Sequence, residues 1–168
     1  LEPTRSNAWT AATPIMDVST TFTLRDGMPY TPVNYDGSEH GPVSVREALA
    51  SSLNIPAVKT LQSVGIENTL NLAHRLGITS LSEAGQYDLS LALGGGKVSL
   101  LQLSTAFGAL ANTGYYTGNT SILDISDADG NLIYAYAPDQ RPPLQILDPR
   151  VVWLISDILS DDSARSIG

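Results

Sequence analysis

The stretch VSVREALASSLNIPAVKTLQSVG, residues 43–65, decides the fold of this chain. Its apolar residues recur with helical spacing, and the polar sequence Ser52-Leu53-Asn54 interrupts them. Two short helices with a break between them are therefore expected. A polar break in an apolar helical pattern can hold side chains for binding or chemistry, and it can also simply cap the helix ends.

Local signals set the start of the first helix. Ser44 and Glu47 have the spacing of a capping box, and Val43 and Ala48 have that of a hydrophobic staple. We therefore expect a helix over residues 45–51.

The break itself follows from Pro56, which lacks a backbone N–H and disfavours helical dihedrals in the residue before it. Asn54 is a suitable N-cap for a second helix over residues 55–63, and Gly65 is a suitable left-handed stop. Ser52 and Asn54 can point into the same space. Judged by local physics alone, this pair favours caps, which stabilise by roughly 0.5–2 kcal/mol, over a binding site.

Composition excludes several classes of protein. The 168 residues carry a net charge of -8, and the nine Lys and Arg are scattered, so nucleic-acid binding is not expected. The chain has no cysteine and only two histidines, which argues against a metal site, and no cofactor is expected. No apolar run approaches the roughly 20 residues that span a bilayer, so the chain as given is expected to be soluble.

The remaining patterns predict a mostly α fold with a small β-hairpin. We expect an extended or loop lead-in over 1–42, a helical core over 43–114, a hairpin over 117–137 and a terminal helix over 148–162. Further helices of the core are expected at 67–76 and 100–112.

Two motifs with a familiar look are better explained by turns. The run Gly94 to Lys97 lacks the first glycine and the final Ser or Thr of a phosphate-binding loop. Asp127, Asp129 and Asn131 begin like a calcium loop, but the glycine is two places early and the closing Glu is missing, which favours a hairpin turn.

The two histidines are more easily explained by structure than by chemistry. His74 lies within a predicted helix, as a surface or hydrogen-bonded histidine. His40 follows the turn-forming sequence Asn-Tyr-Asp-Gly at 34–37, which favours turn packing over a substrate role.

Two longer blocks carry a family resemblance. NYDGSEHGPVSVREALASSLNIPAVKTL at 34–61, followed by YDLSLALGGGKVSLLQLSTAFGALANTG at 87–114, resembles the transpeptidase domain of class A penicillin-binding proteins. The resemblance extends over nearly the whole chain from about Asp17, and its wording is most similar to the C-type branch. It implies that this chain is the helical part of a domain that is α+β when intact.

The resemblance also implies roles for the helix break. That family builds its active site from Ser-x-x-Lys, Ser-x-Asn and Lys-Thr-Gly, and only the second motif is present here, as Ser52-Leu53-Asn54. By resemblance, the Ser52 hydroxyl relays a proton between the lysine beside the nucleophile and the leaving amine. The Asn54 carboxamide binds the backbone of the peptide substrate.

The nucleophile is not in this chain, because neither of its two lysines has a serine three residues before it. We expect the nucleophile upstream of Leu1 and the Lys-Thr-Gly strand downstream of Gly168. The resemblance then implies a serine-type D,D-transpeptidase that cross-links peptidoglycan stem peptides and binds β-lactams. It also implies a membrane anchor and a place at the periplasmic or extracytoplasmic face of the bacterial inner membrane. The isolated chain is expected to be inactive.

Two other functions remain open. The chain could be a non-catalytic penicillin-binding-like module that holds a peptide or a partner. It could also be a helical interaction domain in which Ser52 and Asn54 only cap helices. If the chain is the helical part cut from a transpeptidase domain, removal of the family's central sheet would leave an apolar face uncovered, so the fragment is expected to self-associate.

Overall fold

The computed structural model describes residues 9–137 and 142–165, so the first eight residues of the expected lead-in lie outside it. The fold is mostly α, as predicted. Its α-helices are α1 (Val45–Ala50), α2 (Asn54–Val64), α3 (Ile66–Arg75), α4 (Leu100–Ala111) and α5 (Pro149–Leu159). The 3-10 helices η1 (Ala84–Gln86) and η2 (Leu89–Leu93) lie between α3 and α4, and η4 (Asp162–Arg165) follows α5.

The expected hairpin is present, the extended lead-in contains short strands, and each strand pairs antiparallel with one partner. The pairs are β1 (Pro14–Asp17) with β4 (Gly41–Ser44), β2 (Phe22–Thr23) with β3 (Pro29–Tyr30), β5 (Tyr115–Tyr116) with β8 (Leu144–Gln145), and β6 (Asp124–Ser126) with β7 (Leu132–Ala135). The β2–β3 pair is a local hairpin within the lead-in, whereas β1–β4 and β5–β8 join strands far apart in sequence.

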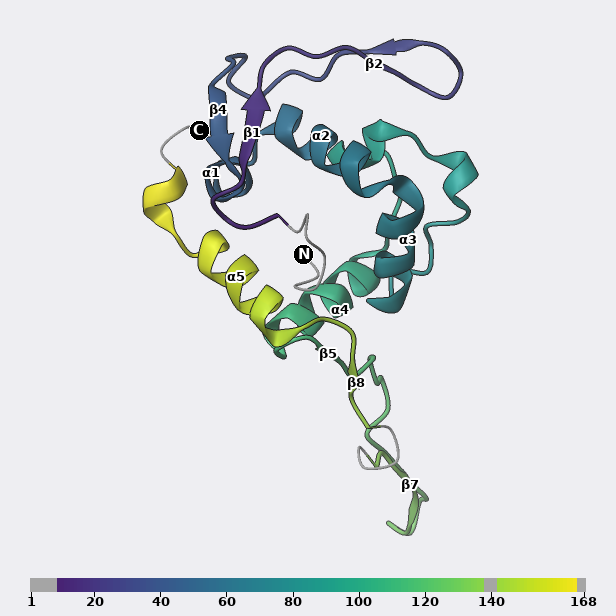
Figure 1. The fold of residues 1–168 in the computed structure, drawn as a ribbon. Helices are drawn as coiled ribbons and strands as arrows, with labels where there is room; N and C mark the ends of the chain where they lie inside the picture. Colours follow the sequence, from purple (N-terminus) through teal and green to yellow (C-terminus); the bar gives the residue numbers. More distant parts are fainter. Residues whose placement is uncertain (1–8, 138–141, 166–168) are drawn as a thin grey trace.

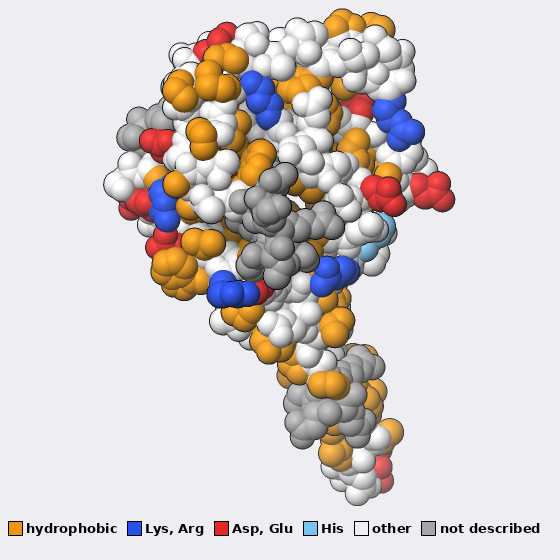
Figure 2. Space-filling model, viewed as in Figure 1, with side chains coloured by type: hydrophobic (Ala, Val, Ile, Leu, Met, Phe, Trp, Pro, Cys, Tyr) orange, Lys and Arg blue, Asp and Glu red, His pale blue; other side chains and the backbone are white. Residues whose placement is uncertain are grey.

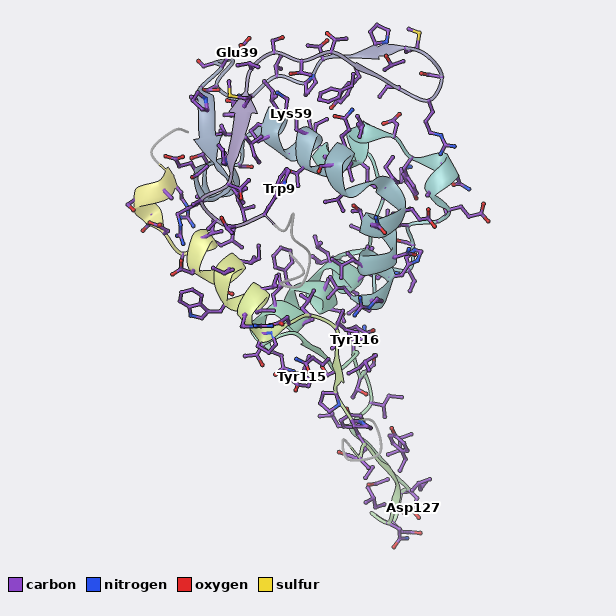
Figure 3. The ribbon with its side chains drawn as sticks, viewed as in Figure 1. Trp9, Glu39, Lys59, Tyr115, Tyr116 and Asp127 are labelled. Atoms are coloured by element: carbon purple, nitrogen blue, oxygen red, sulfur yellow. The ribbon has the colours of Figure 1, made fainter. Side chains whose placement is uncertain are left out.

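The helices form the body of the molecule, and one strand arm leaves it (Figure 1). The β1–β4 pair lies beside α1 and the start of α2, and α5 runs from the region of α4 towards α1, which it contacts. The arm begins at β5 and β8 and ends in the β6–β7 hairpin, with Asp127 at its tip (Figure 3).

The start of α1 confirms the predicted capping box. The Ser44 N–H donates to Glu47 Oε2 at 2.7 Å, and the Glu47 N–H donates to Ser44 Oγ at 3.1 Å. Val43 and Ala48 are both buried and share one apolar cluster with Leu53, so the staple is also present. The helix end is one residue early, at Ala50 rather than at 51.

Helix α5 begins where the terminal helix is predicted to begin; Asp148 is its N-cap and Pro149 lies in its first turn. Arg46 of α1 joins it to the body, because its guanidinium donates to the carboxylates of Asp157 and Asp161. The expected helix over 148–162 is interrupted, however: α5 ends at Leu159 and a 3-10 turn follows.

Both turn interpretations are confirmed. A Cβ on Gly95 would lie 2.7 Å from Ser90 Oγ, and one on Gly96 would lie 2.6 Å from Leu81 Cδ2, so the glycine run is a closely packed turn. In the β6–β7 turn, the Asn131 N–H donates to Asp127 Oδ1 at 2.8 Å. Among the described residues, no cluster of His, Cys, Asp or Glu could hold a metal ion.

Candidate functional site

The helix break at Ser52 is a left-handed turn. Ser52 has φ +56°, and its N–H donates to Leu49 O at 3.2 Å. The Leu53 N–H then donates to Ala48 O at 3.0 Å and closes the turn. Serine rarely adopts this conformation because its Cβ approaches the following carbonyl oxygen.

Neither side chain of the motif caps a helix. The C-cap of α1 is Ser51 and the N-cap of α2 is Leu53, so the expectation that Asn54 would be the N-cap is wrong by one residue. Ser52 is exposed, and no hydrogen bond joins its hydroxyl to another described residue. The hydroxyl is therefore available to exchange protons with a bound molecule.

Asn54 is fixed by Val33 and Asn34, at the start of the turn of residues 34–37. Its Nδ2 donates to Val33 O at 2.7 Å, and its backbone N–H donates to Asn34 Oδ1 at 2.9 Å. The Ile55 N–H donates to the same oxygen at 3.2 Å. Asn34 thus supplies the acceptor that an N-cap side chain would otherwise provide to the first N–H groups of α2.

Behind Asn34 lies a buried polar group. Asn34 is 3% exposed and Asp17 is 0% exposed. Asn34 Nδ2 donates to Asp17 Oδ1 and Oδ2 at 2.9 and 2.8 Å, and to Ser38 O at 2.8 Å. Buried polar groups of this kind are stable when each finds a partner, as these do.

His40 completes the group. Its N–H donates to Asp17 Oδ2 at 3.0 Å, its Nδ1 lies 2.6 Å from the same oxygen, and its Nε2 lies 3.1 Å from Asp36 Oδ2. The hydrogen bond to Asp17 raises the pKa of His40, and the negative charge of Asp36 raises it further. The predicted turn packing of His40 is confirmed, and it extends to the buried carboxylate. The other histidine, His74, lies against Leu81 O, as expected of a hydrogen-bonded residue.

The sequence did not single out Asp17 or Asn34. Asn34 belongs to an Asn-Tyr-Asp-Gly turn, so its sequence context suggests only a turn role. Its contacts are with Asp17 and Asn54, which are distant in the sequence. A usable signal was present, since an aspartate in a strand whose alternate residues are buried needs a polar partner.

The shallow apolar hollow on α5 is separate from this site. It is lined by Pro149, Arg150, Trp153 and Leu154, and none of these contacts the Ser52 turn through a hydrogen bond. In residues 9–137 and 142–165, no helix has both the length and the apolar character needed to cross a membrane.

Comparison with known families places this chain among the penicillin-binding transpeptidases. The family model described as penicillin binding protein transpeptidase domain matches residues 17–168. The chain belongs to this family, and the class A resemblance is confirmed.

Curated relatives support the assignment. The chain is 31% identical to penicillin-binding protein 1A of Neisseria meningitidis over 161 residues, which is 93% of this chain and 20% of that protein. It is 42% identical to penicillin-binding protein 1F of Bacillus subtilis over 132 residues, which is 77% of this chain and 18% of that protein. The chain therefore spans about a fifth of the curated relatives that it matches. The C-type branch stays a prediction.

Solved structures show the same fold. Penicillin-binding protein 1A of Haemophilus influenzae superposes with a TM-score of 0.78 at 20% identity, over 90% of this chain and 26% of that one. PonA1 of Mycobacterium tuberculosis also gives 0.78 at 20% identity, over 89% of this chain and 41% of that one. PonA1 has been solved in complex with penicillin V.

Proposed function

We propose that the chain is part of a peptidoglycan D,D-transpeptidase that works through a serine acyl-enzyme, and that Ser52 and Asn54 belong to its active site. The observation that carries this proposal is the exposed Ser52 hydroxyl in a left-handed turn, two residues before an Asn54 fixed by side-chain and backbone hydrogen bonds. Strained conformations of this kind persist where the surrounding structure holds them and function uses them.

In the proposed reaction, a serine outside this chain attacks the carbonyl of a D-Ala-D-Ala-like bond. The terminal D-alanine leaves as an amine, which takes the proton that Ser52 relays, and an acyl-enzyme remains. The amine of a second stem peptide then attacks the acyl group and forms the cross-link. Proton relays of this type contribute about 10² to 10⁴ in rate.

Asn54 suits the binding of a peptide backbone. Its Nδ2 uses one hydrogen on Val33 O, while Oδ1 accepts no hydrogen bond from a described residue. A carboxamide with a free oxygen and one free N–H hydrogen can pair with the N–H and C=O of a substrate amide. β-Lactams carry a similar amide, so they are proposed as ligands of the intact enzyme.

The family also supports a proposed location at the extracytoplasmic face of the bacterial inner membrane, where stem peptides are exposed. We place the intact enzyme there as a membrane-anchored protein, and we expect no cofactor.

The test uses the full-length protein that contains this chain. Ser52→Ala is expected to slow acylation by a fluorescent penicillin by about 10² to 10⁴. Ser156→Ala, an exposed serine in α5, is the matched control and is expected to react at the normal rate. Unchanged acylation in Ser52→Ala would refute the relay, and a full-length protein that never reacts would favour the non-catalytic binding module.

The isolated 168-residue chain gives a separate test, because we propose that it lacks the nucleophile. It is expected to show no covalent label after treatment with the fluorescent penicillin. A label on any serine of the chain would overturn this part of the proposal.

We also propose that the isolated chain self-associates. Large apolar side chains are exposed on α4 and α5: Leu100 is 80% exposed, Leu101 60%, Phe107 57% and Trp153 64%. Figure 2 shows apolar side chains gathered near α5 and along the arm. Light scattering is expected to give a mass that rises with concentration, and a strict monomer at high concentration would contradict this.

A further inference from the structure

We propose that Asp17, Asn34 and His40 are positioning residues for Asn54, and that the protonation of His40 tightens the position they set. This inference rests on the proposed function, since it concerns how the Ser-x-Asn motif is held. It goes further in assigning three residues from the lead-in, none of which belongs to the motif.

Asn34 connects the lead-in to α2 through hydrogen bonds of its side chain. Its Oδ1 accepts from the N–H groups of Asn54 and Ile55, and its Nδ2 donates to Asp17 and to Ser38 O. These partners fix the orientation of the Asn34 carboxamide. The N–H groups of Asn54 and Ile55 require its oxygen as acceptor, and the Asp17 carboxylate requires its nitrogen as donor. A rotation of this one side chain would break contacts on both sides at once.

Val33 and Asn34 hold Asn54 by two routes. The Asn34 side chain fixes the Asn54 backbone, and the Val33 carbonyl accepts from the Asn54 side chain at 2.7 Å. The free Asn54 Oδ1 therefore takes its position from residues 33–34 and from whatever fixes them. A shift of about 1 Å in such a group can reduce a rate by about 10²-fold.

The end of β1 is fixed from the other side by Lys59 of α2. Lys59 Nζ donates to Met16 O at 2.6 Å and to Val18 O at 3.4 Å, the carbonyls on either side of Asp17. Figure 3 shows Lys59 on α2 beside β1. Helix α2 thus contacts the Asp17 segment through Lys59 and contacts the Asp17 side chain through Asn34.

His40 brings protonation into this group. Both of its ring nitrogens face carboxylate oxygens, Nδ1 towards Asp17 and Nε2 towards Asp36, and a carboxylate oxygen accepts but does not donate. Only the doubly protonated imidazolium donates to both. Loss of that proton removes one of the two contacts and the positive charge between the two acids.

Three charged groups face or flank this position. Asp17 approaches from β1, Asp36 from the loop that carries His40, and Lys59 from α2 binds the carbonyls beside Asp17. The two acids raise the pKa of His40, whereas its partial burial lowers it. The contacts of protonated His40 that help to position Asn54 are therefore fully present below pH 6.5. They are lost as pH rises through the raised pKa of His40.

The first experiment is a double-mutant cycle in the full-length protein, read as the second-order rate constant for acylation by a fluorescent penicillin. Asn34→Ala is expected to lower it about 10- to 100-fold. Asn54→Ala is expected to lower it at least as far, and the double variant no further than Asn54→Ala alone. Asn68→Ala, an exposed asparagine of α3 that also donates to a backbone carbonyl, is the matched control and is expected to have no effect.

Each outcome of the cycle has one meaning. Fully additive losses from Asn34→Ala and Asn54→Ala would overturn the positioning role, because Asn34 would then act independently of Asn54. An unchanged rate in Asn34→Ala beside a reduced one in Asn54→Ala would overturn it too. If Asn54→Ala itself has no effect, the proposed function of the motif fails, which is a separate result.

A second experiment keeps the test decisive if Asn34→Ala does not fold. Asp17→Asn preserves shape and keeps an acceptor, but it removes one negative charge from the side chain that faces His40. In the histidine NMR spectrum, the pKa of His40 is expected to fall in this variant. The alkaline limb of the acylation pH profile is expected to move to lower pH in Asp17→Asn and to disappear in His40→Gln. Superimposable pH profiles in all three proteins would refute the role of His40.

Discussion

The left-handed Ser52 residue gives the sharpest test of the structure. With φ +56°, it occupies a conformation that costs a residue with a Cβ roughly 1–2 kcal/mol and costs glycine little, while glycine loses about 0.5–1 kcal/mol through its more flexible unfolded chain. At the midpoints of these two ranges, the difference leaves Ser52→Gly about 0.7 kcal/mol more stable than Ser52→Ala. Because no described residue pairs with the hydroxyl, Ser52→Ala should stay within about 0.5 kcal/mol of the wild type.

The assay compares glycine with alanine at two serines of the 168-residue chain. Ser156 is exposed in the middle of α5, where glycine is expected to be less stable than alanine by about 0.8–1.0 kcal/mol. In urea or thermal unfolding followed by circular dichroism, the glycine variant should therefore be more stable than the alanine variant at Ser52 and less stable at Ser156. For a chain of this size, a difference of 0.5–1 kcal/mol corresponds to about 1–4 °C in the unfolding midpoint.

A glycine variant that is less stable than the alanine variant at both serines would refute the reasoning, because Ser52 would then not be held at positive φ. In the full-length protein, the same Ser52→Gly variant should be slow in acylation although its fold is at least as stable as that of Ser52→Ala. A gain in stability coupled to a loss of activity is expected where a strained residue serves function.

Three further outcomes follow from the described contacts. Leu53→Ala should cost about 2–4 kcal/mol in unfolding experiments, because Leu53 is 4% exposed in the cluster that joins the two helices. A hydrogen bond from Arg150 lowers the pKa of Asp148 to about 2 from its usual 3.8, so the stability that this N-cap adds is present above pH 3.8 and is lost as pH falls towards 2. The gap in unfolding midpoint between the wild type and Asp148→Ala should narrow over that range, and a constant gap would contradict the pairing. Trp153→Ser should reduce the self-association seen by light scattering, with Ser156→Ala as a control on the same helix.

The helices could be predicted because their signals are local. The capping box of Ser44 and Glu47 and the Asp148-Pro149 start of α5 each lie within four residues, so sequence spacing alone identifies them. Errors of one or two residues arise at the ends, where several hydrogen-bonding patterns have similar energies.

The contacts that hold the candidate site could not be predicted in the same way. The β1–β4 pair joins residues such as Ile15 and Val43, and no local pattern selects that pairing. The left-handed conformation of Ser52 is also invisible to propensity, which assigns positive φ to glycine or asparagine first. Resemblance to a family identified the motif, but the residues that hold it became visible only through hydrogen bonds between distant parts of the chain.

The arrangement separates the residues that fix the turn from the one that is exposed within it. Leu53, which directly follows Ser52, is buried, and the N–H of the next residue, Asn54, is bound to Asn34. These anchors hold the Ser52 backbone at positive φ, although the Ser52 side chain contributes no hydrogen bond among the described residues. Changes to the anchors should therefore alter stability and chemistry together, whereas removal of the Ser52 hydroxyl should alter chemistry with little change in stability. That asymmetry is what an active-site serine predicts and what a helix cap does not.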